Sequence, residues 1–124
     1  MRKGYTGWVL TEATRKTLLE MFPPKYDKVV AHHITFAFNV TEEDVPPEAI
    51  ASVVGYRDSF DGLEVLVVEV NGSTERDDGS VYHITWSLDP DMYTPKDSNK
   101  LLETGFKKIS PFMIDVKPFF NPFG

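Results

Sequence analysis

Two nearly identical tetrapeptides constrain the fold of this chain more than any other feature of its sequence. They read HITF from His33 and HITW from His83, fifty positions apart. Each lies in a stretch rich in β-branched, aromatic and apolar residues, a composition typical of β-strands. The repeat therefore predicts two equivalent central strands, each beside a predicted helix.

Because successive side chains of a strand point to opposite faces, each motif separates polar from apolar residues. The polar or small residues expected on one face are His33, Thr35 and Ala37 in the first strand and His83, Thr85 and Ser87 in the second. The large apolar residues expected on the other face, under the helices, are Ile34, Phe36 and Phe38, then Ile84, Trp86 and Leu88. If the two strands are neighbours in one sheet, two imidazoles and two hydroxyls meet in a shared cleft.

The remaining patterns complete an α+β chain that forms a single domain over residues 1–124. Strand patterns cover residues 5–10, 28–38, 63–70, 81–88 and 109–116. Helix patterns cover residues 12–22, with Thr11 as the N-cap, and residues 97–104, with Gly105 as the stop. The segment 48–59 fits either a short helix leading into a strand or a strand throughout.

Composition excludes several classes of protein. The 124 residues are 41% hydrophobic and include no Cys, which argues against a disordered chain and removes disulfides, thiolate catalysis and Cys-ligated zinc. No apolar run of about 18 residues is present to span a membrane. The basic start is followed from Thr11 by a charged stretch, unlike a secretory signal. We therefore expect a compact, cytoplasmic protein that does not engage membranes.

The net charge of −6 is unevenly distributed along the chain. Residues 31–95 hold two Arg against thirteen Asp and Glu, whereas both flanks are weakly basic. Long nucleic acids favour a basic face, because neutralising their phosphates releases counterions. The acidic balance therefore favours a small phosphate ligand over duplex DNA, although the flanks can supply a local basic pocket.

Two imidazoles that face a common space can perform general acid–base chemistry at phosphorus. Near neutral pH, one can remove a proton from the attacking water or hydroxyl while the other protonates the leaving oxygen. The hydroxyls of Thr35 and Thr85 can hydrogen-bond the non-bridging phosphate oxygens, and Ala37 and Ser87 leave room for the substrate. This chemistry requires no metal and no other cofactor.

With these motifs, the chain resembles the 2H phosphoesterase superfamily, which is defined by two H-hydrophobic-[ST]-hydrophobic strands. HITF and HITW match that pattern at every position. The later segment PDMYTPKDSNKLLE resembles the cyclic phosphodiesterase domain of fungal and plant tRNA ligases. Phage-encoded 2H enzymes that destroy cyclic-oligonucleotide immune signals are similar too. The likeness extends from residue 5 to about residue 102.

The resemblance implies a bilobal, pseudo-symmetric fold in which antiparallel sheets form a central cleft and helices pack outside. It also implies hydrolysis of a 2′,3′-cyclic phosphate or a related phosphodiester, with His33 and His83 as acid and base and Thr35 and Thr85 on the phosphate. Because the motif is symmetric, the identity of the base stays open. The chain is shorter than most members, so we expect trimmed substrate-selecting loops.

Other residues are candidates for substrate contacts. Tyr5 can stack on a base. Tyr93 and Lys96 lie in the loop after the second motif, where they can close over the substrate and contact its phosphate. Ser98 and Asn99 are expected to hold that loop through hydrogen bonds to the backbone.

The last group of residues is expected to be structural. The third histidine, His32, should point away from His33 and have a structural or supporting role. Asp89 and Asp91 are typical of a turn rather than of a metal site, and residues 75–78 should form a solvated hairpin loop.

Taken together, the sequence favours a metal-independent phosphodiesterase that hydrolyses a small cyclic phosphate on a nucleotide, an RNA end or a cyclic oligonucleotide. One alternative is a nucleotide-binding module, such as a sponge or an RNA-end binder, that lacks catalysis. Another is an enzyme that cuts or joins linear RNA, which would need a basic surface that this composition supplies poorly. We expect a monomer or a weak homo-oligomer, in which the Phe-rich tail either closes the core or is an exposed contact.

Overall fold

The computed structural model describes residues 2–123, which form strands, two α-helices and one short 3₁₀ helix. In chain order, the elements are β1 (Gly4–Leu10), α1 (Glu12–Met21), β2 (Lys28–Val29), β3 (His33–Val40), the 3₁₀ helix η1 (Glu42–Asp44), β4 (Ala51–Asp58), β5 (Leu63–Val70), β6 (His83–Leu88), α2 (Asp97–Leu102), β7 (Lys107–Ile114) and β8 (Val116–Pro122). None of these helices is long and apolar enough to cross a membrane.

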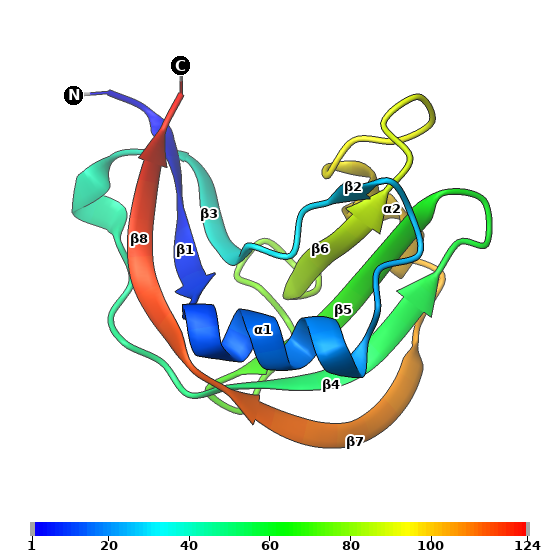
Figure 1. Ribbon diagram of the computed structural model, residues 1–124. Coiled ribbons are helices and arrows are strands. Elements are labelled where there is room, and N and C mark those ends of the chain that lie inside the picture. The colour runs from blue at the N-terminus through cyan, green and yellow to red at the C-terminus, as the bar shows by residue number, and fades with distance from the viewer. Residues whose placement is uncertain (1, 124) are drawn as a thin grey trace.

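The strands form two antiparallel sheets, which confirms the predicted α+β class. One sheet has the order β3-β1-β8, and the other has the order β2-β6-β5-β4-β7. Figure 1 shows the sheets side by side, with α1 in front and the stretch β7–β8 bending from one sheet into the other. The two H-I-T-aromatic motifs therefore lie in different sheets, β3 in the smaller and β6 in the larger.

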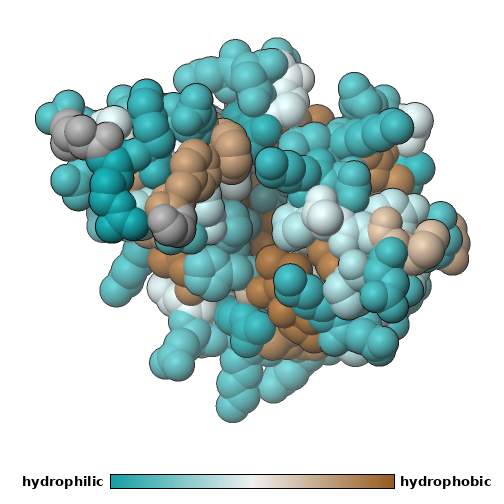
Figure 2. Space-filling model, turned by 90° about the horizontal axis from the view of Figure 1, so that it is seen from above, coloured by the Kyte–Doolittle hydropathy of each residue, from teal (hydrophilic) through white to brown (hydrophobic). Residues whose placement is uncertain are grey.

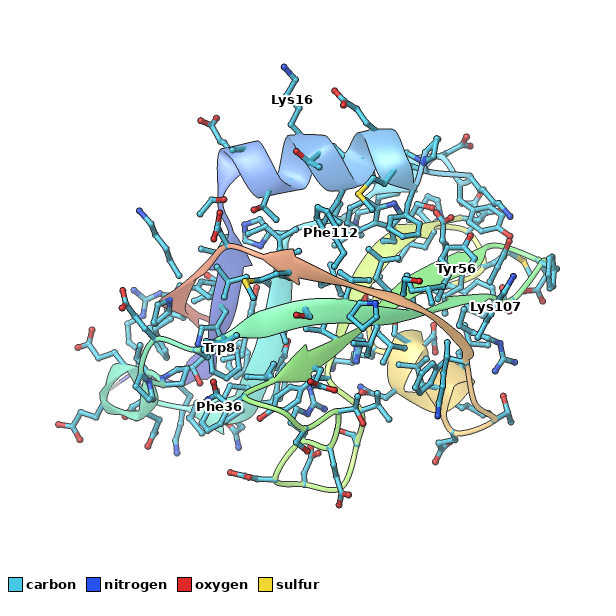
Figure 3. The ribbon with its side chains drawn as sticks, turned by 90° about the horizontal axis from the view of Figure 1, so that it is seen from below. Trp8, Lys16, Phe36, Tyr56, Lys107 and Phe112 are labelled. Carbon is cyan, nitrogen blue, oxygen red and sulfur yellow. The ribbon has the colours of Figure 1, made fainter. Side chains whose placement is uncertain are left out.

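Helix α1 begins and ends close to where the sequence predicts. The Thr11 side chain accepts a hydrogen bond from the backbone N–H of Thr14 (3.3 Å), as an N-cap residue does. Two prolines follow shortly after the helix and prevent its continuation. Leu18 is fully buried against the sheets, whereas Lys16 points away from the molecule (Figure 3). The helix thus covers one side of the core with a single apolar face.

The main core lies where the two sheets and α1 meet. It includes Trp8 from β1, Ile34 from β3, and Ile84 and Trp86 from β6, all at most 2% exposed. Trp8 also meets Phe36 edge to face, with ring centroids 5.4 Å apart, and Figure 3 shows the two rings near each other. The apolar residues of both motifs up to their aromatic position thus pack inward, as predicted.

A second apolar cluster covers the other face of the larger sheet. It contains Leu63, Val65 and Val67 from β5, Leu88 from β6 and Leu102 from α2. Strand β5 is therefore buried on both faces, which explains why its sequence is almost continuously apolar. The predicted buried strand over residues 63–70 is confirmed.

The single strand predicted over residues 28–38 is wrong. The chain leaves the larger sheet after β2 and enters the smaller sheet at β3. Between them, Ala31 has a φ of 41°, and its N–H still donates to the carbonyl of Thr85 in β6 (3.0 Å). One residue later, the carbonyl of His32 accepts from the N–H of Leu10 in β1 (3.0 Å). The segment does have the composition of a β-strand, but its residues pair in two different sheets.

The C-terminal segment makes the same kind of crossing. The strand predicted over residues 109–116 corresponds to β7, but it ends at Ile114, and Val116 already begins β8. Strand β7 pairs with β4, and β8 pairs with β1. Asp115 lies between them and bonds the start of α1: its carbonyl accepts from the N–H of Thr11 (3.2 Å), and its own N–H donates to the Thr14 hydroxyl oxygen (3.1 Å). The Phe-rich tail therefore forms an edge strand of the smaller sheet.

Two further segments differ from or refine the predictions. Residues 51–58 form β4 without a preceding helix, which favours the strand reading of the ambiguous segment 48–59. Helix α2 ends at Leu102, two residues earlier than predicted, and Gly105 follows with a φ of +100°. A glycine tolerates this left-handed conformation without a steric penalty.

Candidate active site

A cavity of about 770 Å³ collects residues from both sheets and from the loop before α2. It is lined by Tyr5, Val30, His33, Thr35, Phe38, Arg76, Asp78, His83, Thr85, Thr94, Pro95, Lys96 and Asn99. Seen from above in Figure 2, apolar residues are visible in the middle of the face, between hydrophilic margins. Both His-x-Thr pairs therefore border one space, although they lie in different sheets.

Each motif carries a strand irregularity at its aromatic residue. In β3, Thr35 pairs with Gly7 and Ala37 pairs with Thr6, so Phe36 has no partner of its own. In β6, the same break in register leaves Trp86 unpartnered, between pairs made with Val65 and Glu64 of β5. Such bulges bend a strand and change which face the following residues occupy.

The bulges overturn the alternation expected beyond each motif. Phe38 was expected opposite His33, but it lines the cavity with it, whereas Ala37 does not. In β6, Leu88 joins the cluster beneath α2. Ser87 is fully buried and donates a hydrogen bond to Glu64 Oε1 (2.6 Å). Ala37 and Ser87 therefore do not provide the space for a substrate that the simple alternation predicts.

His83 is held in one tautomer by a backbone carbonyl. Its side chain is nearly buried, and Nδ1 lies 2.8 Å from the oxygen of Val81. A carbonyl can only accept, so Nδ1 carries the proton, and Nε2 of the neutral ring keeps its lone pair. Burial lowers the pKa of His83, and the positive charge of Arg76 acts in the same direction, although the hydrogen bond to Val81 opposes it.

His33 sits among aromatic rings. Its centroid lies 5.0 Å from that of Tyr5 and 5.5 Å from that of Phe119, a residue of the last strand. Burial, followed by the charges of His32 and His83, lowers the pKa of His33 to about 4. At neutral pH both cavity imidazoles are therefore uncharged.

His32 is the clearest correction among the site predictions. It was expected to point away from His33, but the Nδ1 atoms of the two rings lie 3.0 Å apart. The alternation rule fails because β3 begins only at His33, and the left-handed backbone of Ala31 turns the chain just before it. His32 itself is exposed. Its side chain therefore connects the more buried His33 to solvent.

The two threonines differ in their surroundings. The Thr85 hydroxyl lies 2.8 Å from the hydroxyl of Ser98, a fully buried residue of α2. When Ser98 donates to it, the Thr85 hydroxyl donates in turn to the carbonyl of Pro95 (3.4 Å), so it would have to give up this long hydrogen bond to bind a ligand in the cavity. Thr35 is only partly buried and lines the cavity from β3.

Arg76 is the cavity residue that sequence reasoning missed. It was assigned to a solvated hairpin loop, yet it is 8% exposed and lines the cavity. Its guanidinium donates to the Thr35 carbonyl (3.4 Å) and to Asn99 Oδ1 (3.3 Å), and it pairs with Asp78 (3.3 Å). The available signal was its isolation, since residues 31–95 contain only two Arg among thirteen acidic residues.

The loop between β6 and α2 is fixed from within. Asp97 Oδ2 accepts from the backbone N–H of Thr94 (2.8 Å), and Asn99 Nδ2 donates to the carbonyl of Lys96 (3.5 Å). Lys96 reaches over the ring of Phe38, with Nζ 5.4 Å from the centroid. The hydrogen bond to the backbone expected of Asn99 is confirmed, whereas the Ser98 side chain bonds the Thr85 hydroxyl instead of the loop backbone.

Tyr93 is not brought to the cavity. Its hydroxyl donates to Asp61 Oδ1 (2.7 Å), and its ring packs against the cluster beneath α2. The loop turns at Asp89 and Asp91, where Asp89 Oδ1 accepts from the Asp91 N–H (3.0 Å). This turn directs Tyr93 toward the β4–β5 hairpin.

The whole chain was compared with known proteins. Protein-family models, curated proteins and solved structures yielded no match. The site must therefore be interpreted from its own chemistry. Over residues 2–123, no group of three or more His, Cys, Asp and Glu side chains is positioned to hold a metal ion.

Proposed function

We propose that this protein is a phosphodiesterase that hydrolyses a small cyclic phosphate by two-histidine acid–base catalysis. The observation that carries the proposal is that His33 and His83, from different sheets, border one cavity with Arg76 between the elements that hold them. Two imidazoles and a guanidinium are suited to phosphoryl chemistry, since they can move protons and offset negative charge.

In the proposed reaction, one imidazole removes a proton from water while the water oxygen attacks phosphorus. The bond to the leaving oxygen breaks, and the other imidazole protonates that oxygen. Arg76 can bind a non-bridging oxygen through the one N–H of its guanidinium that has no partner among residues 2–123. Thr35 and Thr85 can donate their hydroxyls to the same oxygens.

Membership of the 2H phosphoesterase superfamily, with its bilobal and pseudo-symmetric fold, is part of this proposal. It is supported by the arrangement of the strands, since each sheet supplies one H-I-T-aromatic strand to the cavity. The bulge at the aromatic residue of both motifs is a second point of similarity between the halves. Two unrelated strands would not be expected to share it.

A nucleotide is the favoured substrate because the cavity is partly aromatic. The rings of Tyr5 and Phe38 stack at 6.3 Å with an interplanar angle of 14°, and Phe38 is 55% exposed. An exposed aromatic face can stack on a base of any sequence. The volume lies in the range of small-molecule sites, which suits a nucleotide or an RNA end better than duplex DNA. A cytoplasmic location and a monomeric or weakly oligomeric state stay predictions.

The test is phosphorus NMR of the purified protein with EDTA and a panel of cyclic phosphates. The panel contains 2′,3′-cyclic nucleotides and cyclic di- and trinucleotides. We expect the wild type to open at least one ring, and His33→Gln or His83→Gln to reduce that rate by about 10²-fold or more. Turnover that occurs only when EDTA is omitted would contradict the metal-free mechanism.

A non-catalytic nucleotide-binding module is the second candidate, favoured by one observation. Both cavity histidines have lowered pKa values, so the charged imidazolium form that favours general acid catalysis is disfavoured in both rings. A binding module would leave every ligand of the panel intact, and the His→Gln variants would keep most of their affinity in a calorimetric titration. Ring opening by the wild type would exclude this candidate.

A further inference from the structure

The contact between His32 and His33 distinguishes the two cavity histidines. A neutral imidazole carries a proton on only one of its nitrogens, and two Nδ1 atoms at 3.0 Å need one proton between them to form a hydrogen bond. Either ring can be the donor. The neighbour of His83 Nδ1 is the carbonyl of Val81, which can only accept, so Nδ1 of that ring must be the donor. The two motifs are alike in sequence but differ in what their imidazoles can do.

A general acid in this cavity faces an electrostatic difficulty. To protonate a leaving oxygen, an imidazole needs a proton on Nε2 and a positive charge to release with it. The low pKa of His33, about 4, means that burial disfavours that charge on its ring at neutral pH. His32 is exposed, so water can solvate a positive charge placed on its ring instead.

We propose that His32 is a positioning residue that holds this charge and supplies it to His33 through the Nδ1–Nδ1 hydrogen bond, which makes His33 the general acid and His83 the general base. This inference rests on the proposed function. A charged His32 must donate from Nδ1, so His33 must accept at Nδ1 and carry its own proton on Nε2. That nitrogen is the one free to reach a substrate.

The proton movements balance over one turnover. Water gives a proton to Nε2 of His83, and its oxygen forms the new bond to phosphorus. The leaving oxygen takes the Nε2 proton of His33, whose Nδ1 receives the Nδ1 proton of His32. After product release, His83 loses its proton to solvent and His33 gains one at Nε2. The Nδ1 proton of His33 then returns to His32.

The groups around the pair leave this path open. His33 is flanked by Tyr5 of β1, Phe119 of β8 and, across the cavity, His83 of β6. Phe119 also contacts His32 edge to face, at 5.9 Å. Within residues 2–123, His32 forms no ion pair. Asp78, the carboxylate of the cavity wall, is already paired with Arg76.

The first test is nitrogen NMR of the imidazole rings, which does not depend on activity. The chain contains three His, so each ring can be assigned from one His→Gln variant. At a pH at which the spectra show His32 charged, we expect His33 to be neutral with its proton on Nε2. His32→Phe keeps a ring but removes both nitrogens, and it should abolish this preference. A proton on Nδ1 of His33, or a charged His33 beside a neutral His32, would overturn the inference.

The second test compares leaving groups. Opening of a 2′,3′-cyclic phosphate releases an alkoxide that needs a proton, whereas bis(p-nitrophenyl) phosphate releases a stable phenolate. His32→Phe should lower kcat for the cyclic substrate by about 10²-fold and change that for the aryl substrate little, whereas His83→Gln should lower both. Lys16→Ala, on the outer face of α1, serves as the control. An equal loss with both substrates would overturn the inference.

The two tests separate the inference from the proposed function. If the wild type hydrolyses neither substrate, the proposed function fails. The NMR result still decides whether His32 sets the tautomer of His33.

Discussion

Arg76 brings a guanidinium into the same cavity as two imidazoles, in a chain whose net charge is −6. Its positively charged guanidinium pairs with Asp78 and also borders the cavity. Hydrogen bonds, chiefly from Ser80, hold the pKa of Asp78 to about 2, so this partner is ionised at any working pH. The pair can therefore orient the guanidinium, whose one N–H without a partner among residues 2–123 can bind a ligand.

We expect Arg76→Lys to weaken catalysis more than it weakens the fold. Lysine keeps the charge but cannot reach Thr35, Asn99 and Asp78 with one planar group. The value of kcat/KM for a cyclic phosphate should fall by about 10²-fold, or ~2.7 kcal/mol in transition-state stabilisation. Steady-state kinetics together with urea unfolding would measure both effects.

Arg57→Lys is the matched control for this prediction. Arg57 donates to the carbonyls of Leu101 and Gly105 behind α2, away from the cavity lining. It should lose stability with little change in kcat/KM. If both variants lose activity equally, Arg76 has only a structural role.

At the scale of strands, the pairing of β1 with β3 sets the position of the first motif. Gly7 lies opposite the bulge at Phe36, and a Cβ added there would collide with the carbonyl oxygen of Ile34. A glycine inside a strand usually weakens it. Gly7, however, is the residue that lets two backbones approach closely enough to accommodate the bulge.

Gly7→Ala is therefore expected to displace β3 and to destabilise the protein. The contact is with backbone rather than a flexible side chain, so relief requires movement of the strand, at a cost of roughly 1–3 kcal/mol. Urea unfolding would measure the loss, and backbone NMR shifts of His33 and Thr35 would report the displacement. Gly72→Ala is the comparison for the NMR shifts: a Cβ there meets no atom within 4 Å, so this variant should lose stability through its φ of +87° without displacing β3. Unchanged shifts in Gly7→Ala would contradict the expectation.

The sequence predicted most elements, but not the points where strands change face or sheet. Alternation correctly placed Ile34 and Ile84 inward, because these residues precede the bulges. It failed at Phe38 and Leu88, since a bulge depends on the register with a partner strand that is distant in sequence. The break at Ala31 was hidden for the same reason. β-rich residues look alike whether they serve one sheet or two.

At the scale of the whole molecule, the buried histidines couple stability to pH. The pKa of His33 falls from 6.5 in the unfolded chain to about 4 in the folded protein, and that of His83 is also lowered. Between pH 6.5 and about 4, the unfolded chain therefore binds more protons at His33 than the folded protein does. The free energy of unfolding must therefore decrease as pH falls from 6.5 toward 4.

We expect each histidine to contribute a slope of at most about 1.4 kcal/mol per pH unit in this window. Urea unfolding at several pH values from 4.5 to 7.5 would measure how the free energy of unfolding changes with pH. His33→Gln should flatten the slope. Asp58 acts in a different window, since hydrogen bonds from Lys25 and Tyr26 outweigh its burial and lower its pKa below 3.8. If His33→Gln leaves this slope unchanged, His33 is equally protonated in the folded and the unfolded protein, and the expectation fails.

The site as a whole could be predicted only in part. The two His-x-Thr pairs follow from their repetition, and they line the same cavity. The contributions of Arg76, Phe38 and His32 could not be predicted, because each depends on a loop or bulge that brings distant segments together. Tyr93 shows the opposite failure, since a suitable residue in a suitable loop turns toward Asp61.

The smaller sheet joins two strands from the first third of the chain to the last strand, in the order β3-β1-β8. Phe119 of β8 forms part of the surroundings of both His32 and His33. Pairing over such sequence separations is slow to form. During synthesis on a ribosome, β1 and β3 would emerge well before their third partner. A nascent chain that still lacks β8 would thus present His32 and His33 to water, and the surroundings of this pair would be complete only when β8 docks.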